Sequence, residues 1–152
     1  MQQLMVGEHQ LGTATLVSRT SLTAPTTDTL KAALYLTTAT VNAATTAYSA
    51  SNEVSGTGYV AGGVTVTNAT APNSTNTTAT AGVAFFTPSA SITYTTVTLA
   101  TAFDAVLLYN STQSNKAISV HTFGSQTVTA GTFTLTMPSN TTTTALIRLA
   151  TT

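Results

Sequence analysis

The sequence predicts an all-β fold: a single-domain antiparallel β-sandwich of jelly-roll type, preceded by an N-terminal arm. About a quarter of the 152 residues are Thr, whose β-branched side chain favours strands. Charged residues make up 5%, against about 25% in ordinary soluble domains, so the charged helix formers are almost absent. Short apolar runs are separated by turn signals about every ten residues, which is typical of sandwiches. We assign residues 1–12 to the arm and residues 13–152 to the sandwich.

Eight or nine strands are expected. The main signal is the alternation of apolar and polar residues, since successive side chains of a strand face opposite sides of its sheet. Between Leu30 and Leu36, for example, Ala32 and Leu34 share one face and Tyr35 takes the other. In chain order, the predicted strands are Thr13–Arg19, Leu30–Leu36, Val64–Thr67, Val83–Phe86, Ile92–Leu99, Phe103–Tyr109, Ile118–Thr122, Val128–Met137 with a break at Gly131, and Ala145–Leu149.

The strand Phe103–Tyr109 is expected to be central in its sheet. It is apolar on both faces, with Val106 and Leu108 on one and Ala105 and Leu107 on the other, and a strand buried on both faces needs neighbours on both sides. Segments rich in Pro, Gly or small polar residues are predicted as loops, turns or breaks. These are residues 37–51, Asn68–Ala79, Asn110–Asn115, Gly124–Ser125 and Pro138–Thr144.

The most distinctive stretch is Asn52–Gly63, which connects two predicted strands. It contains four glycines, a large aromatic at Tyr59, and Glu53, one of only four acidic residues in the chain. Glycine accommodates a positive φ and the close approach of another backbone, so the stretch predicts two tight turns around a short extended piece. Because Glu53 is the one charge there, we expect it to accept hydrogen bonds from the turned backbone.

The balance of charges limits the kinds of binding partner that the sequence predicts. Four basic residues match four acidic ones, so the formal net charge is zero and no basic patch can neutralise phosphates; nucleic-acid binding is not expected. Weak self-repulsion and strand edges without Lys favour association, so we expect a homo-oligomer. Residues 1–12 and 141–152 are expected to lie against neighbouring chains. No apolar run is long enough to span a membrane, and no membrane partner is expected.

The titratable residues are too scattered to predict a catalytic, metal or cofactor site. The two histidines are His9 and His121, and the four carboxylates are Glu8, Asp28, Glu53 and Asp104. A zinc site needs three or four convergent ligands, and a general base needs a titratable neighbour. We therefore expect no catalytic residue, metal, cofactor or small-molecule substrate. Asp104 interrupts an apolar strand, and we expect it near the strand's rim, either capping a turn or paired with Lys31, Lys116 or Arg148.

Several segments together carry a resemblance to a known family. They are Leu30–Leu36, Tyr48, Asn52–Tyr59, Gly62–Gly63, Ala105–Tyr109 and Gly131–Leu135. In type and order they resemble a family of small structural proteins of tailed-phage virions, which includes capsid cement, or decoration, proteins. The resemblance spans about residues 28–137, and its most specific part is the run from Glu53 to Gly63. This chain has far fewer Asp and Lys residues than many relatives.

The resemblance implies a virion structural protein rather than an enzyme. Such a protein is made in the cytoplasm of the bacterial host and binds the major capsid protein on the outside of the phage head, where it acts by binding alone. Two alternatives stay open: a neck or tail component of the virion, and a host-binding fibre or adhesin β-domain. An enzyme is the last alternative, because convergent polar residues are missing from the sequence.

Overall fold

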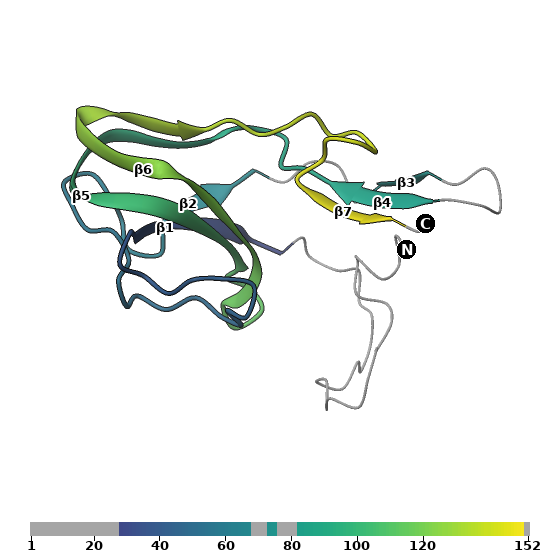
Figure 1. Ribbon diagram of the computed structural model, residues 1–152, viewed down its shortest axis with the longest axis horizontal. Helices are drawn as coiled ribbons and strands as arrows, with labels where there is room; N and C mark the ends of the chain where they lie inside the picture. The colour runs from purple at the N-terminus through teal and green to yellow at the C-terminus, as the bar shows by residue number, and fades with distance from the viewer. Residues whose placement is uncertain (1–27, 68–72, 76–81, 151–152) are drawn as a thin grey trace. The chain divides into compact units, whose positions relative to one another are not determined.

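A computed structural model describes residues 28–67, 73–75 and 82–150. Over these residues the protein is all-β, with no helix and only antiparallel pairing, so the predicted fold class is confirmed (Figure 1). The predicted arm 1–12 and the predicted strand Thr13–Arg19 lie outside the described residues. The strands are β1 (Leu30–Leu36), β2 (Val64–Val66), β3 (Asn73–Thr75), β4 (Val83–Phe86), β5 (Ile92–Asn110), β6 (Lys116–Leu135) and β7 (Ile147–Ala150).

The chain divides into two compact units, which we describe separately. The first contains Asp28–Thr67 and Ala90–Thr136 and holds a four-stranded sheet in the order β2-β1-β5-β6. The second contains the described residues of 73–89 and 137–150 and holds a three-stranded sheet in the order β3-β4-β7. In the second unit the Thr87 hydroxyl is buried and accepts a hydrogen bond from the Leu146 backbone N–H at 2.9 Å, just before β7 begins.

β5 is the central strand of the four-stranded sheet, as its sequence predicts. Its C-terminal half pairs with β1 on one side and with β6 on the other. Every residue from Ala105 to Tyr109 is buried, because both faces of the sheet are covered at this point. On one face, Tyr35, Leu107 and Tyr109 belong to a buried cluster packed against Val41 and Tyr48 of the connection that follows β1.

Aromatic rings, buried on β5 and half-buried on β6, form a second cluster along the β5–β6 hairpin. Phe103 is fully buried, and its ring meets the ring of Phe133 edge-on at a centroid distance of 5.0 Å. The ring of Phe123 contacts both of these rings, and the ring centroids of Tyr94 and Phe133 are 6.1 Å apart. Edge-to-face pairs of this kind add about 0.5–1.5 kcal/mol each beyond the burial of their area. The two long strands are therefore tied together by side chains as well as by backbone hydrogen bonds.

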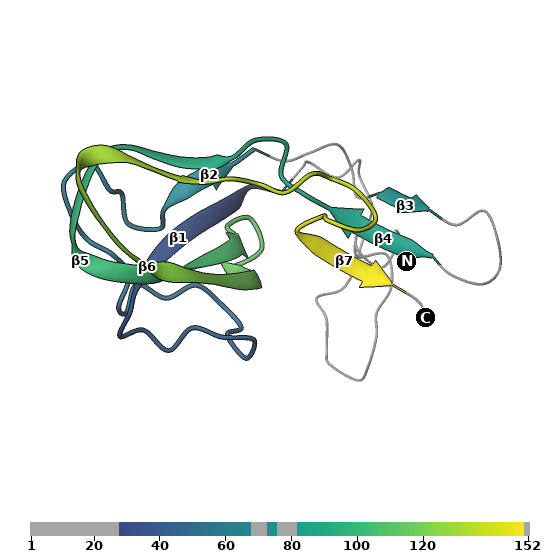
Figure 2. The same ribbon diagram turned by 45° about the horizontal axis from the view of Figure 1, so that its top comes forward.

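Two strands are longer than the sequence indicates. The prediction of separate strands Ile92–Leu99 and Phe103–Tyr109 is wrong, because β5 is one strand of 19 residues. The prediction that Gly124 and Gly131 break the following strand is also wrong, because β6 runs through both for 20 residues. The pairing of β5 with β6 shifts register at several points, so bulges absorb the residues that interrupt the alternation. Figure 2 shows the two strands following each other along most of their length.

The remaining differences are small. β3 lies inside Asn68–Ala79, which the sequence predicts as a loop, because its three residues pair with β4. β7 begins two residues later than the predicted strand Ala145–Leu149 and ends one residue later. β1 has the predicted bounds, and residues 37–51 form no helix or strand, as expected for a loop.

Candidate functional site

The glycine-rich stretch Asn52–Gly63 is fastened by its backbone to two strands of the sheet. The Val54 N–H donates to the Leu34 carbonyl of β1 at 2.9 Å, and the Leu36 N–H donates to the Asn52 carbonyl at 3.0 Å. Farther along, the Thr98 N–H of β5 donates to the Thr57 carbonyl at 2.9 Å. The stretch is thus a shaped connection between β1 and β2, in agreement with its sequence.

The carboxylate of Glu53 is the centre of this region. Its Oε1 accepts hydrogen bonds from the Gly62 backbone N–H and from the Tyr59 hydroxyl, both at 2.7 Å. Its Oε2 accepts one from the Tyr48 hydroxyl at 2.7 Å. The predicted bond from turned backbone is confirmed at Gly62, while the two tyrosine donors were not predicted. We call Glu53, Tyr48, Tyr59, Gly62 and Tyr109 the Glu53 cluster.

Tyr109 joins the Glu53 cluster through backbone and ring contacts. Its hydroxyl donates to the Gly62 carbonyl at 2.8 Å. The backbone N–H of Gly62 donates to Glu53, so both backbone polar groups of this glycine are hydrogen-bonded. Its ring stacks on that of Tyr48 at a centroid distance of 4.7 Å and an interplanar angle of 16°. The turn that contains Gly62 is therefore tied to the central strand β5 as well as to Glu53.

The other tyrosines fasten nearby backbone in the same way. The Tyr94 hydroxyl donates to the Ala32 carbonyl at 2.8 Å, and the Tyr35 hydroxyl donates to the Ser49 carbonyl at 2.6 Å. The Tyr59 hydroxyl, besides donating to Glu53, accepts from the Leu34 N–H at 3.0 Å. All five tyrosines of the chain thus use their hydroxyls to fix backbone or Glu53.

The electrostatics of these tyrosines favour a structural role over acid–base chemistry. Burial raises the pKa of the Tyr59 and Tyr94 hydroxyls far above the ordinary value near 10, and the negative charge of Glu53 raises both further. Burial, followed by the hydrogen bond to Glu53, also raises the pKa of Tyr48. A general acid or base works best with a pKa near the operating pH. These hydroxyls stay protonated at neutral pH and serve as hydrogen-bond donors.

Glycine is required at Gly58, where the backbone has a φ of +77°. A Cβ at this position would also collide with the Thr96 carbonyl oxygen of β5. We expect Gly58→Ala to lower the free energy of unfolding by about 2 kcal/mol, because it combines a strained conformation with a backbone clash. Urea denaturation measures the change.

Gly124 is the matched control for that substitution. It lies in β6 with no atom within 4 Å of an added Cβ, so Gly124→Ala should leave the stability unchanged or slightly raised. Equal losses for the two alanine variants would show that the close approach at Gly58 is not what limits stability.

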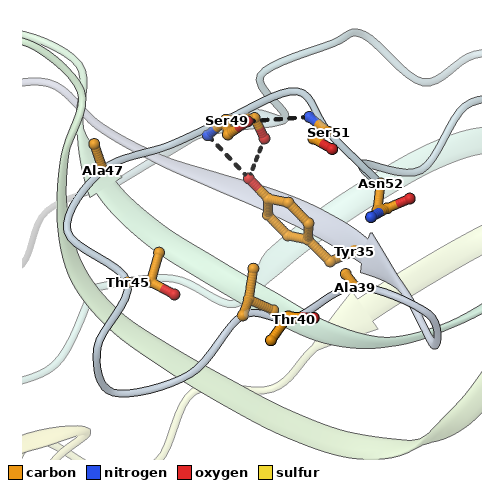
Figure 3. Close-up of a pocket in the computed structure, with 9 residues that line it drawn as sticks. Tyr35, Ala39, Thr40, Thr45, Ala47, Ser49, Ser51 and Asn52 are labelled. Atoms are coloured by element: carbon orange, nitrogen blue, oxygen red, sulfur yellow. Dashed lines mark hydrogen bonds between the residues drawn. The ribbon is translucent and has the colours of Figure 1, made fainter.

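A cavity of about 240 Å³ lies beside the buried ring of Tyr35. Nine residues line it, and Figure 3 shows the Tyr35 hydroxyl directed at the Ser49 backbone at one side. The lining consists of hydroxyl, amide and small apolar side chains, such as Thr40, Ala47 and Asn52, without a charged group. Such a cavity can accept a small neutral group, but it contains neither a nucleophile–base pair nor a set of metal ligands.

Asp28 and His121 form their side-chain hydrogen bonds outside the Glu53 cluster. Asp28 accepts hydrogen bonds from the side chains of Asn110 and Gln113 at 2.6 and 3.2 Å. His121 lies 2.9 Å from the Ser119 hydroxyl, and burial lowers the pKa of its ring. In the described part of the chain, no three His, Cys, Asp or Glu residues are grouped as metal ligands would be.

Asp104 differs from its prediction. It is half-buried within β5 beside a register shift, rather than at the start of a strand. Its expected role, capping a turn or pairing with Lys31, Lys116 or Arg148, stays a prediction. Glu8 and His9 lie outside the described residues.

No family model, curated protein or solved structure matches the chain. Among the described residues, no helix is long and apolar enough to cross a membrane.

Proposed function

We propose that this chain is a structural protein of a tailed-phage virion, a capsid decoration protein that binds the major capsid protein on the outside of the head. The observation that carries the proposal is the Glu53 cluster. Tyr48, Glu53, Tyr59 and Gly62, which carry the family resemblance in the sequence, are the residues that hydrogen-bond to one another in the structure. The most specific part of the resemblance, from Glu53 to Gly63, thus contains residues that share a physical task, while its other segments are strands of ordinary composition.

The cluster suits a protein that acts by binding. The three hydrogen bonds to Glu53 and the bond from Tyr109 fix the turn between Tyr59 and Gly62. Val60 lies in this turn with 70% of its surface exposed, the largest value among the exposed large hydrophobic residues of the described chain. A rigid turn loses little conformational entropy when a partner covers it. In this proposal the turn is a preorganised contact point, and Val60 packs against a neighbouring protein.

The proposal includes assembly and a finer architecture. The protein forms homo-oligomers on the capsid exterior, and it binds no nucleic acid, membrane, cofactor or small-molecule substrate. Residues 13–152 form one jelly-roll-like sandwich in this proposal, and the antiparallel pairing within each described sheet supports its all-β class. An experimental structure with a different strand connectivity would contradict this architecture without touching the assembly role.

Quantitative mass spectrometry of purified virions tests the proposed function. A decoration protein should be present at a copy number comparable with that of the major capsid protein, and antibody labelling should cover the whole head. A small fixed copy number, with label confined to the neck, tail or fibres, would support the alternative structural roles. Absence of the chain from the virion would overturn all three.

Binding of purified protein to phage heads also tests the proposed contact at the turn between Tyr59 and Gly62. Val60→Lys places a charge on the proposed contact while leaving the Glu53 cluster intact, so it should weaken binding of purified protein to heads that lack it. Thr93→Lys, on an exposed position of β5 opposite the uncharged Thr134, is the matched control and should bind as the unmodified protein does. Equal binding by all three proteins would remove Val60 from the contact.

A further inference from the structure

β6 is an edge strand with an unusually long free side. It pairs with β5 on one side and is the last strand of its sheet. On the other side, the connection after β1 covers only its beginning, where the Ala117 N–H donates to the Thr46 carbonyl and the Tyr48 N–H donates to the Asn115 carbonyl. From Ile118 to Leu135 no described strand pairs with that side. Natural edge strands are usually short, charged or covered, because unpaired backbone groups attract another strand.

The side chains of β6 do not protect this edge. Between Lys116 and the end of the strand there is no Asp, Glu, Lys or Arg. No residue of β6 is fully buried, so the whole strand is accessible in the described part of the molecule. Ile118 is 40% exposed and is one of three large hydrophobic residues exposed to that degree or more among those that the structure describes. The edge therefore combines unpaired backbone with apolar surface.

One part of β6 is suited to pairing by its regular geometry. Ser119 to Thr122 pair with successive residues of β5 without a register shift, whereas the segment from Thr122 to Phe133 contains several. Bulges twist an edge away from a partner, and a regular run leaves its backbone groups in line. We define the open edge as this regular run with one further residue on either side, Ile118–Phe123.

We propose that the open edge binds the same edge of a second copy, so that two β6 strands pair antiparallel about a two-fold axis near His121. This inference specifies one interface of the assembly proposed above and rests on that proposal. A two-fold axis brings identical patches together, and antiparallel pairing of a strand with its own copy satisfies this geometry. The four-stranded sheets of two copies then form one continuous sheet.

Charge favours a second copy over a charged partner. The open edge has no formal charge, and burial lowers the pKa of His121, which keeps its ring neutral at neutral pH. In a pairing about His121, the Lys116 residues of the two copies lie beyond opposite ends of the paired run, so they do not face each other. Thr122 lies opposite Val120 of the other copy, a β-branched pair that packs well across strands.

Sedimentation velocity of the purified full chain tests the proposal without capsids, so its outcome is independent of whether the protein decorates a phage head. We expect a reversible dimer. Thr122→Lys and Thr122→Glu should each weaken dimerisation by about tenfold or more, because each places like charges near the axis. Thr93→Lys, on an exposed position of β5 that pairs with Thr134 rather than with the open edge, should leave the dimer unchanged.

Mixing the two charged variants of Thr122 shows whether they dimerise weakly because of their charge or because they misfold. The Lys and Glu variants of Thr122 should associate with each other more tightly than either does with itself, and native mass spectrometry would detect the mixed dimer. Hydrogen exchange should show that amides of residues 118–123 gain protection as concentration rises. A monomer at every accessible concentration, a dimer unaffected by both Thr122 variants, or protection that is independent of concentration would each overturn the proposal.

Discussion

Replacing Glu53 by alanine is expected to lower the free energy of unfolding by about 2–4 kcal/mol, among the largest effects of any single substitution in this chain. The change removes the acceptor of three hydrogen bonds, from the Tyr48 and Tyr59 hydroxyls and from the Gly62 N–H. An unsatisfied buried donor costs about 1–3 kcal/mol. Glu53 is half-buried, so water replaces part of what is lost, and the full sum is not expected. Urea denaturation, with an unchanged dependence on denaturant, measures the loss.

Two further variants identify the cause. Glu53→Gln keeps the shape of the side chain and one acceptor oxygen, but its amide group cannot accept from Tyr48, so its loss should be smaller than that of alanine. Asp104→Asn is the control, because Asp104 is also half-buried but forms no hydrogen bond like those of Glu53. A loss for Asp104→Asn as large as that for Glu53→Ala would mean that charge in general, rather than the Glu53 cluster, sets the stability.

The local pattern of the sequence was sufficient to predict β1 and the central part of β5. Leu30–Leu36 alternates clearly and is bounded by polar residues, and Phe103–Tyr109 is apolar on both faces. In both segments the burial of side chains and the preference of the residues for strands agree. Agreement between local preference and tertiary packing is what makes a segment predictable from sequence.

The length of β5 and β6 was not predictable from the same signals. Thr96 and Ala130 have positive φ values of 54° and 47°, which local preference alone disfavours inside strands. The two strands continue past Thr96 and Ala130 because β5 and β6 pair with each other both before and after these residues. The packing of Phe103 against Phe133 across the hairpin also holds the strands together. These stabilising contacts join residues about thirty positions apart, so a local reading of glycine or threonine as a break fails.

The centre of the candidate site was partly predictable. Glu53 stood out because charge is scarce in this chain, and that scarcity correctly indicated a hydrogen-bonding role for its half-buried side chain. The tyrosine donors were missed because Tyr48 and Tyr59 flank Glu53 at distances of five and six residues within irregular backbone, where spacing does not fix direction. Tyr109 comes from β5 and meets Gly62 only through the sheet. The five tyrosines lie near one carboxylate only in the three-dimensional structure, so the cluster is not visible in the sequence.

Alkaline pH is expected to unfold the protein cooperatively, and this is the largest effect that we predict. Burial raises the pKa of Tyr35, Tyr94 and Tyr109, whose side chains are only 1–2% exposed, and Glu53 raises each further. The folded-state pKa lies above the unfolded value near 10, so the stabilisation is fully present below pH 10 and is lost as the pH rises through the folded-state pKa. Each such tyrosine costs about 1.4 kcal/mol per pH unit in that range.

Because three buried tyrosines act together, two pH units above 10 remove at most about 8 kcal/mol, three times about 1.4 kcal/mol per unit, which lies within the 5–15 kcal/mol that typically stabilises a domain. Tyrosinate absorbance and far-ultraviolet circular dichroism should therefore change in one shared, steep transition. Tyr35→Phe removes one hydroxyl, its bond to the Ser49 carbonyl and one of the raised pKa values, so its transition should be less steep. Gradual ionisation of the tyrosines near pH 10 while the β-sheet signal stays intact would contradict this account, since it would mean that water reaches hydroxyls that the packing of β1 and β5 should exclude from it.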